Sequence, residues 1–153
     1  MRSLLHTLVG LALLMSAIVR AGPSEDALRV GEESLAAGDR QAAKTTWLNA
    51  YNERATANTA TDETCATLLE KVGQLCLEDG DAQTAHAIYE KLLPLRESLS
   101  GAGGTEIAKV MVTCAELIVI TGGDSTRAER LSKEAVTIFE KAGGQFDGER
   151  FKP

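Results

Sequence analysis

Few residues in this sequence could carry chemistry. The chain of 153 residues has two histidines, His6 and His86, and three cysteines. No second histidine stands near His86 at a metal-ligand spacing, and no Cys-x-x-Cys pair occurs. The motifs of serine hydrolases, phosphate-binding loops and dinucleotide-binding folds are missing as well. We therefore expect no enzyme activity, no metal and no cofactor, and we interpret His86 as an exposed structural residue.

A recurring Gly-Asp pair organises the rest of the chain. The pairs are Gly38-Asp39, Gly80-Asp81 and Gly123-Asp124, at spacings of 42 and 43 residues. Glycine adopts positive φ without a Cβ penalty and so ends a helix, while aspartate caps the helix that follows. Each pair therefore predicts a tight turn between two helices.

Small and aromatic residues follow the same spacing. Gly31 and Gly73 stand seven residues before the first two turns, and Ala115 is the corresponding residue of the third unit. Small residues also follow each turn, at Ala43, Ala85 and Ala128. Trp47 and Tyr89 come four residues after the first two of these alanines, but Ser132 takes the third position. We expect the small residues to let paired helices approach closely and the aromatic rings to fill the space beside them.

The stretches between the turns show helical periodicity, and none alternates as a strand does. The sequence thus predicts an all-α fold of three helix-turn-helix units, about 24–57, 60–100 and 104–143, within one domain over residues 22–144. The pattern Thr126 to Glu129 predicts a capping box at the start of the last helix. Pro94 is expected to kink or end the fourth helix. The polar segment 145–153 is expected to fray.

This arrangement resembles the tetratricopeptide repeat. The residues that carry the resemblance are Gly31, Gly38-Asp39, Ala43, Trp47 and Ala50, and then Gly73, Gly80-Asp81, Ala85 and Tyr89. A period near 42 is closer to the longer repeats of the kinesin light chain type than to the usual period of about 34. The resemblance implies a right-handed α-α superhelix with a concave surface that binds protein. The alternative is a helical bundle that matches the repeat by chance.

The resemblance also places a groove on the first helix of each unit. The residues implied are Leu28, Glu32 and Leu35 from the first unit, Glu70, Gln74 and Leu77 from the second, and Val112, Glu116 and Val119 from the third. The lysine and asparagine with which some family members hold a peptide carboxylate are missing from these positions. An apolar or basic protein or peptide is therefore the expected partner, unless these residues simply pack between units.

Two interpretations of the cysteines stay open. Cys65 and Cys76 lie about 16 Å apart along one predicted helix and cannot bond each other. A shift of 42 residues aligns Cys114 with Val72, one turn before Cys76. The thiols are either apolar members of the core, or Cys76 and Cys114 form a disulfide between the second and third units.

The N-terminal segment predicts export. Arg2 is followed by an apolar stretch from Leu4 to Val19, which ends in Val19-Arg20-Ala21 as a signal-peptidase site does. We expect a signal peptide over residues 1–21, the alternative being an uncleaved anchor, and a periplasmic or secreted mature protein. Loss of Arg2 and Arg20 changes the net charge from −6 to −8, which disfavours nucleic acid and anionic lipid as partners.

We therefore expect a protein-binding adaptor. The alternative function is a structural one, in which the chain associates with further copies of itself. In that case the outer face of the last helix, including Ile138, is the expected contact, because no separate capping helix follows it.

Overall fold

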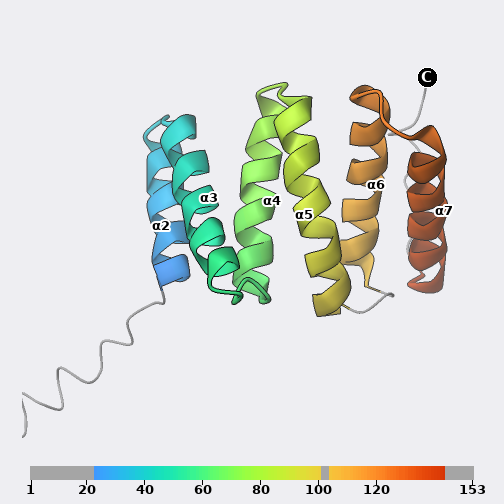
Figure 1. The fold of residues 1–153 in the computed structure, drawn as a ribbon, viewed down its shortest axis with the longest axis horizontal. Helices are drawn as coiled ribbons and strands as arrows, with labels where there is room; N and C mark the ends of the chain where they lie inside the picture. The colour runs from blue at the N-terminus through green and yellow to red at the C-terminus, as the bar shows by residue number, and fades with distance from the viewer. Residues whose placement is uncertain (1–22, 101–103, 144–153) are drawn as a thin grey trace, which may run out of the picture.

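The computed structural model describes residues 23–100 and 104–143, and in these ranges the chain forms helices without any strand. The helices are α2 (Pro23–Ala36), α3 (Arg40–Thr56), α4 (Glu63–Glu78), α5 (Ala82–Ser100), α6 (Thr105–Ile120) and α7 (Ser125–Lys141). They stand side by side in chain order (Figure 1). The predicted all-α fold of three helix-turn-helix units is confirmed. The predicted signal peptide, residues 1–21, and the tail, 145–153, lie outside the described residues.

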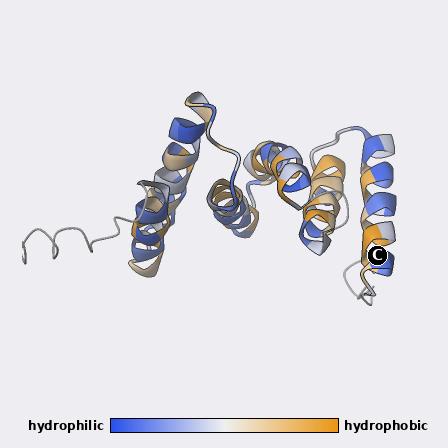
Figure 2. Ribbon diagram, turned by 90° about the horizontal axis from the view of Figure 1, so that it is seen from below, coloured by the Kyte–Doolittle hydropathy of each residue, from blue (hydrophilic) through white to orange (hydrophobic). Residues whose placement is uncertain are grey.

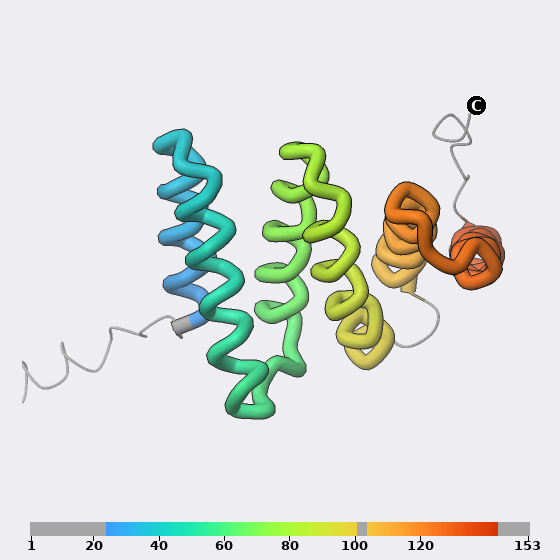
Figure 3. The backbone as a smooth tube through the Cα atoms, turned by 45° about the horizontal axis from the view of Figure 1, so that its top comes forward, coloured from blue at the N-terminus to red at the C-terminus, as the bar shows by residue number. Residues whose placement is uncertain are grey.

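The helices pack as a row of pairs. Each helix contacts the next one along the chain, both inside a unit and between units. Among the described helices, α2 and α4 are the only ones not consecutive in the chain whose Cα atoms come within 8 Å of each other. The array is therefore open, and each unit is supported chiefly by its neighbours (Figure 3).

The Gly-Asp turns of the first two units have the predicted geometry. Gly38 and Gly80 have φ of 84° and 75°. The Asp39 carboxylate accepts a hydrogen bond from the Ala42 amide at 2.8 Å, and Asp81 accepts one from the Thr84 amide at 3.0 Å. Glycine thus ends one helix and aspartate caps the next, as expected from their chemistry.

The third turn differs from the prediction in two details. Gly122, with φ of 75°, takes the left-handed position, and Gly123 is the additional residue of the longer turn. Asp124 is the cap of α7 and accepts a hydrogen bond from the Thr126 amide at 2.9 Å. The capping box predicted at Thr126 is therefore wrong, because a better acceptor stands two residues earlier.

The small residues bring the helices of a pair together. A Cβ atom at Gly31 would lie 2.0 Å from Trp47 Nε1, and one at Gly73 would lie 2.6 Å from the Tyr89 ring. Trp47 is 1% exposed, and its indole donates to the Leu28 carbonyl at 3.3 Å. The aromatic rings therefore occupy the volume that side chains at these glycines would fill.

Pro94 does not end α5, which continues to Ser100. The proline ring is exposed, whereas Leu95 and Arg96 after it are buried. Arg96 forms ion pairs with Glu63 and Glu70 of α4. These tertiary contacts hold the last turns of the helix in place despite the missing N–H.

The hydrophobic core extends through all three units as one cluster. In Figure 2 the ribbon of α6 is mostly pale to orange, whereas α7 at the end of the row is mostly blue. This contrast is expected for an inner helix covered on two sides and a terminal helix with one face in water. None of the described helices is long and apolar enough to cross a membrane.

Candidate functional site: a groove on the first helices

Two cavities lie on the side of the array formed by the first helices of the units. The first, of about 450 Å³, opens between α2, α3 and α4, and the second, of about 260 Å³, between α4, α5 and α6. Glu70 and Gln74 of α4 line both cavities. We call the two cavities together the groove. It follows the array from the first unit to the third, with α4 at its centre.

The first cavity has an apolar floor. Leu35, Trp47 and Leu75 line it, and the last two are almost fully buried. Lys71 crosses its edge, with Nζ 5.4 Å from the centroid of the Trp47 ring, and forms an ion pair with Glu32. An apolar side chain of a partner, placed in this cavity, would cover the parts of Leu35, Trp47 and Leu75 that are still in contact with water.

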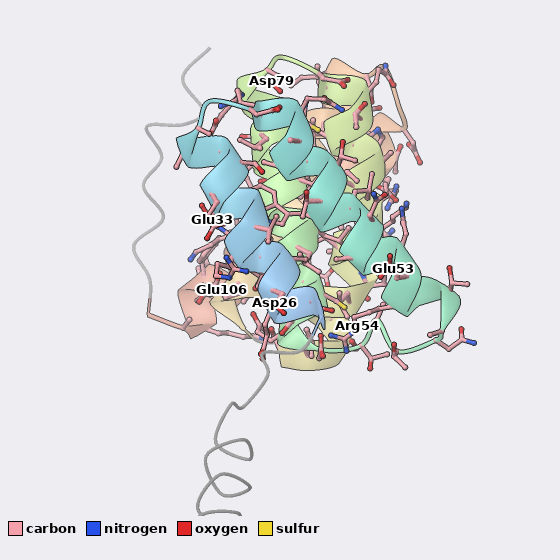
Figure 4. The ribbon with its side chains drawn as sticks, turned by 90° about the vertical axis from the view of Figure 1, so that its left-hand side faces the viewer. Asp26, Glu33, Glu53, Arg54, Asp79 and Glu106 are labelled. Carbon is pink, nitrogen blue, oxygen red and sulfur yellow. The ribbon has the colours of Figure 1, made fainter. Side chains whose placement is uncertain are left out.

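The charges at the end of the first cavity are paired with one another. Arg40 of α3 bonds Glu78 at 3.0 Å and Asp79 at 2.7 Å, and Lys44 bonds the other oxygen of Asp79 at 2.7 Å. Hydrogen bonds from Lys44 and Arg40 lower the pKa of Asp79, which lies at the turn after α4 (Figure 4). The pairs join the first unit to the second and leave little net charge at this end of the groove.

The second cavity is more polar. Tyr89 forms its floor, with Val110 and Thr113 on one side and Glu70 and Gln74 on the other. Burial, and then the nearby Glu70 carboxylate, raise the pKa of Tyr89 to about 12, so its hydroxyl is neutral at physiological pH. The cavity thus combines a neutral aromatic floor with a carboxylate wall.

At the other end of the helices a different charge pair links the first two units. Arg54 of α3 donates to Asp62 at 2.5 Å and to the Thr59 carbonyl at 2.9 Å. Figure 4 shows Arg54 at the opposite end of α3 from the turn that carries Asp79. Together these two sets of bonds fix both ends of the joint between the first and second units, and with it the shape of the first cavity.

Three of the predicted groove residues, Leu35, Glu70 and Gln74, line the groove. Glu32 is exposed beside it, bonded to Lys71. Leu28 is half-buried and packs against the core, and its backbone carbonyl accepts the hydrogen bond from Trp47. In the first and second units, three of the six positions that the resemblance implies therefore line the two cavities.

The other predicted residues lie elsewhere. Four do not line either cavity: Leu77, Val112, Glu116 and Val119. Leu77 and Val119 are exposed, while Val112 and Glu116 are half-buried. In the third unit the groove is lined instead by Glu106, Lys109, Val110 and Thr113. The lining positions of the third unit differ from the predicted ones because α6 does not pack on α4 in the way that α4 packs on α2. Positions 42 residues apart are therefore not equivalent in the second and third units.

Some groove residues could have been found from sequence. Trp47 and Tyr89 were already expected to fill the space beside the small residues, which places them under the surface of the first helices. Lys71 and Lys109 carry no sequence signal, because a lysine on an amphipathic helix is usually part of a solvated face.

The cysteines are free thiols, and all three are buried. No Cα atom of α4 comes within 8 Å of a Cα atom of α6, a separation beyond the reach of a disulfide. The Cys114 thiol donates instead to the Tyr89 carbonyl at 3.6 Å, and burial raises its pKa to about 12. The structure therefore does not form the Cys76–Cys114 disulfide and agrees with the alternative of core thiols.

His86 is not an exposed residue, contrary to the expectation. Its side chain is 23% exposed and lies 3.4 Å from Glu90 and 3.0 Å from the Thr121 hydroxyl. Among the described residues, no group of three or more His, Cys, Asp and Glu side chains could hold a metal ion.

The sequence matches no known protein family, and no curated protein is detectably similar to it. The arrangement of six helices in consecutive antiparallel pairs is consistent with a helical repeat.

Proposed function

We propose that this chain is an exported adaptor of the tetratricopeptide type that binds a partner protein in the groove. The observation that carries the proposal is the first cavity, in which Trp47 and Leu75 underlie an opening of about 450 Å³ between two units. Cavities of this size with an apolar floor are typical of places where a partner's side chain is buried. We propose neither an enzyme nor a nucleic-acid-binding protein.

The partner is an apolar or basic segment. Its apolar side chain would occupy the first cavity, above Trp47. Arg96 bonds Oε1 of Glu70, and the second oxygen of this carboxylate, which lines both cavities, would accept a hydrogen bond from a lysine or arginine beside that anchor. In this mechanism the helical array supplies shape, and Glu70 supplies a hydrogen-bond acceptor.

A photo-reactive amino acid at position 74 tests the site directly. Gln74 is exposed and lines both cavities, whereas Gln83, which is also exposed, lies on α5 and lines neither. The probe at position 74 should crosslink one defined protein in the native compartment, and the same probe at position 83 should not. Equal crosslinking from both positions would count against the groove.

Blocking the groove tests affinity for the partner so identified. Gln74→Trp should fill the opening between the cavities without disturbing the core and weaken binding roughly tenfold or more. Gln83→Trp is the matched control and should leave both binding and stability unchanged. If Gln74→Trp binds the partner with wild-type affinity, the groove is not the binding site.

Self-association is the second candidate function, and one observation favours it. Val119 and Ile120, at the end of α6, are 64% and 67% exposed. Ile138, which was expected to provide the contact, is 5% exposed and faces the core, so that residue is excluded. Sedimentation at several concentrations decides the matter. A monomer at all concentrations removes this candidate, and a dimer that Val119→Asp dissociates supports it.

A further inference from the structure

A buried arginine holds the carboxylate at the centre of the groove. Arg96 of α5 is 5% exposed, and its guanidinium bonds two carboxylates of α4. Its Nε and Nη2 both bond Oε1 of Glu70, at 2.9 Å and 2.7 Å, and Nη1 bonds Oε1 of Glu63. All three nitrogens are therefore engaged, which fixes the position of the guanidinium.

Packing alone does not require an arginine at this position. Arg96 stands eleven residues after Ala85, and Phe139 of the third unit stands eleven residues after Ala128. Phe139 is half-buried and packs against the core, so an apolar side chain takes the corresponding place there. Replacing a buried ion pair by apolar residues of similar size is often neutral or stabilising. We therefore expect the pair of Arg96 with Glu70 to serve more than stability.

Among the described units, the second alone combines such an arginine with a carboxylate of the groove. Arg54 is the corresponding residue of the first unit, and it bonds Asp62 and the Thr59 carbonyl. Leu28 precedes Glu70 by 42 residues and is apolar. The pair is therefore not a general feature of the repeat. It belongs to α4 and α5, where the two cavities adjoin.

The bonds from Arg96 determine how Glu70 faces the groove. Both reach the same oxygen, Oε1, and no described residue bonds Oε2. Because Glu70 lines both cavities, Oε2 is an acceptor available to a bound molecule. Two bonds to Oε1 restrict rotation of the carboxylate, so little freedom is lost when a ligand binds Oε2. The strongest donor for such an oxygen is a charged one, a lysine ammonium or an arginine guanidinium.

We propose that Arg96 is the positioning residue that gives the groove its preference for a basic side chain. This rests on the proposed function, because it concerns how the groove selects its partner. Arg96 holds Oε1 of Glu70, and a lysine or arginine of the partner donates to Oε2. One guanidinium faces two carboxylates here, and Glu63 is 66% exposed, so the cluster keeps one negative charge for the incoming cation.

Selection of peptides separates this inference from the proposed function. Random heptapeptides are displayed and selected on the full chain, and those that no longer bind the Gln74→Trp chain are kept. The kept peptides should carry an arginine or lysine beside an apolar residue. If no peptide is lost with Gln74→Trp, the proposed function fails and this inference fails with it. If the kept peptides lack basic residues, the groove stands as a binding site and this inference is overturned.

A substitution that conserves charge tests the role of Arg96. A kept peptide with arginine as its basic residue is compared with the same peptide containing citrulline, which has nearly the same shape but no charge. The wild-type chain should bind the arginine form roughly tenfold more tightly, the effect of one charge-assisted hydrogen bond. Arg96→Lys keeps the charge but loses the fork, so this ratio should fall to about threefold or less. Glu63→Gln is the control and should leave the ratio unchanged, because Glu63 lines neither cavity.

The ratio is informative because a merely structural role of Arg96 would weaken the binding of both peptides equally. In the Glu70→Gln chain the two peptides should bind equally well, and adding Arg96→Lys should change nothing further. A second measurement uses the wild-type chain. The NMR signal of the Arg96 Nε–H should shift when the arginine peptide is added and shift less with the citrulline peptide. Equal shifts would overturn the proposal, as would an Arg96→Lys chain that keeps the wild-type ratio.

Discussion

Gly31 and Gly73 show how a missing side chain determines the packing of a pair of helices. Glycine inside a helix costs roughly 1 kcal/mol relative to alanine. Here the cost is offset, because the ring of Trp47 or Tyr89 lies where a Cβ atom would be. The third unit has Ala115 and Ser132 at the corresponding positions, so a small side chain and a small partner replace the glycine and the ring.

Gly31→Ala should therefore destabilise the protein, although alanine is the better helix former. The added Cβ would lie 2.0 Å from Trp47 Nε1, so the indole must move and the pair must open. We expect a loss of about 1–3 kcal/mol in the free energy of unfolding, measured by urea titration. The same change at Gly38 meets open space but a φ of 84°, and should cost about 1 kcal/mol. A more stable Gly31→Ala variant would contradict the packing described here.

At the scale of the helices, Asp79 is one of the residues that join the first unit to the second, through Arg40 and Lys44. The Lys44 hydrogen bond, with that of Arg40, lowers its pKa in the folded chain. Because folding lowers this pKa, the ionised carboxylate stabilises the fold at any pH above its pKa in the unfolded chain, which is near 4. That stabilisation is lost as the pH falls through the pKa of Asp79 in the folded chain. The joint should therefore weaken in acid.

Asp79→Asn should lower the urea midpoint at neutral pH, because Arg40 and Lys44 lose their ionic partner. The difference from the wild type should shrink below about pH 4, where the wild-type carboxylate becomes protonated as well. Glu33→Gln is the control, since among the described residues Glu33 pairs with Arg29 of the same helix. A difference that stays constant from neutral pH to about pH 3 would show that the charge of Asp79 does not support the joint.

The helices were predictable from sequence because their ends are local. Gly38-Asp39 and Gly80-Asp81 encode a turn within a few residues, so no knowledge of distant contacts was needed. That α5 continues beyond Pro94 could not be predicted, because the stability of its last turns depends on Arg96 and its partners on α4, which are distant in sequence. Val112 was misplaced for a similar reason, since the rotation of α6 is decided by its contacts with α5 and α7.

For the molecule as a whole, the reactivity of the three buried thiols can show how the units open. Cys65 and Cys76 belong to the second unit and Cys114 to the third, and all are at most 1% exposed. Burial raises the pKa of each thiol, so little reactive thiolate is present while the chain is folded.

Each thiol should react with an alkylating reagent about a thousandfold more slowly than a free cysteine, since reaction requires local unfolding. Mass spectrometry of timed samples would give a rate for each position. Similar rates at all three would show that the second and third units open together, and a faster Cys114 would show that the terminal unit opens first. Rapid labelling of Cys76 in the folded chain, or its recovery in a disulfide, would contradict the buried free thiol.

The row-like packing of the helices also bears on how the chain reaches its fold. Apart from α2 and α4, the Cα atoms of the described helices come within 8 Å only of helices next to them in sequence, and a few side-chain contacts, such as Arg127 with Glu90, reach one helix further. Such a structure has low contact order, so little chain entropy is lost before each favourable contact forms. Folding can begin in any pair of helices and spread outward, at the microsecond-to-millisecond rates of helical proteins. A chain of this kind spends little time with apolar surface exposed, and so presents few opportunities for aggregation before it is folded.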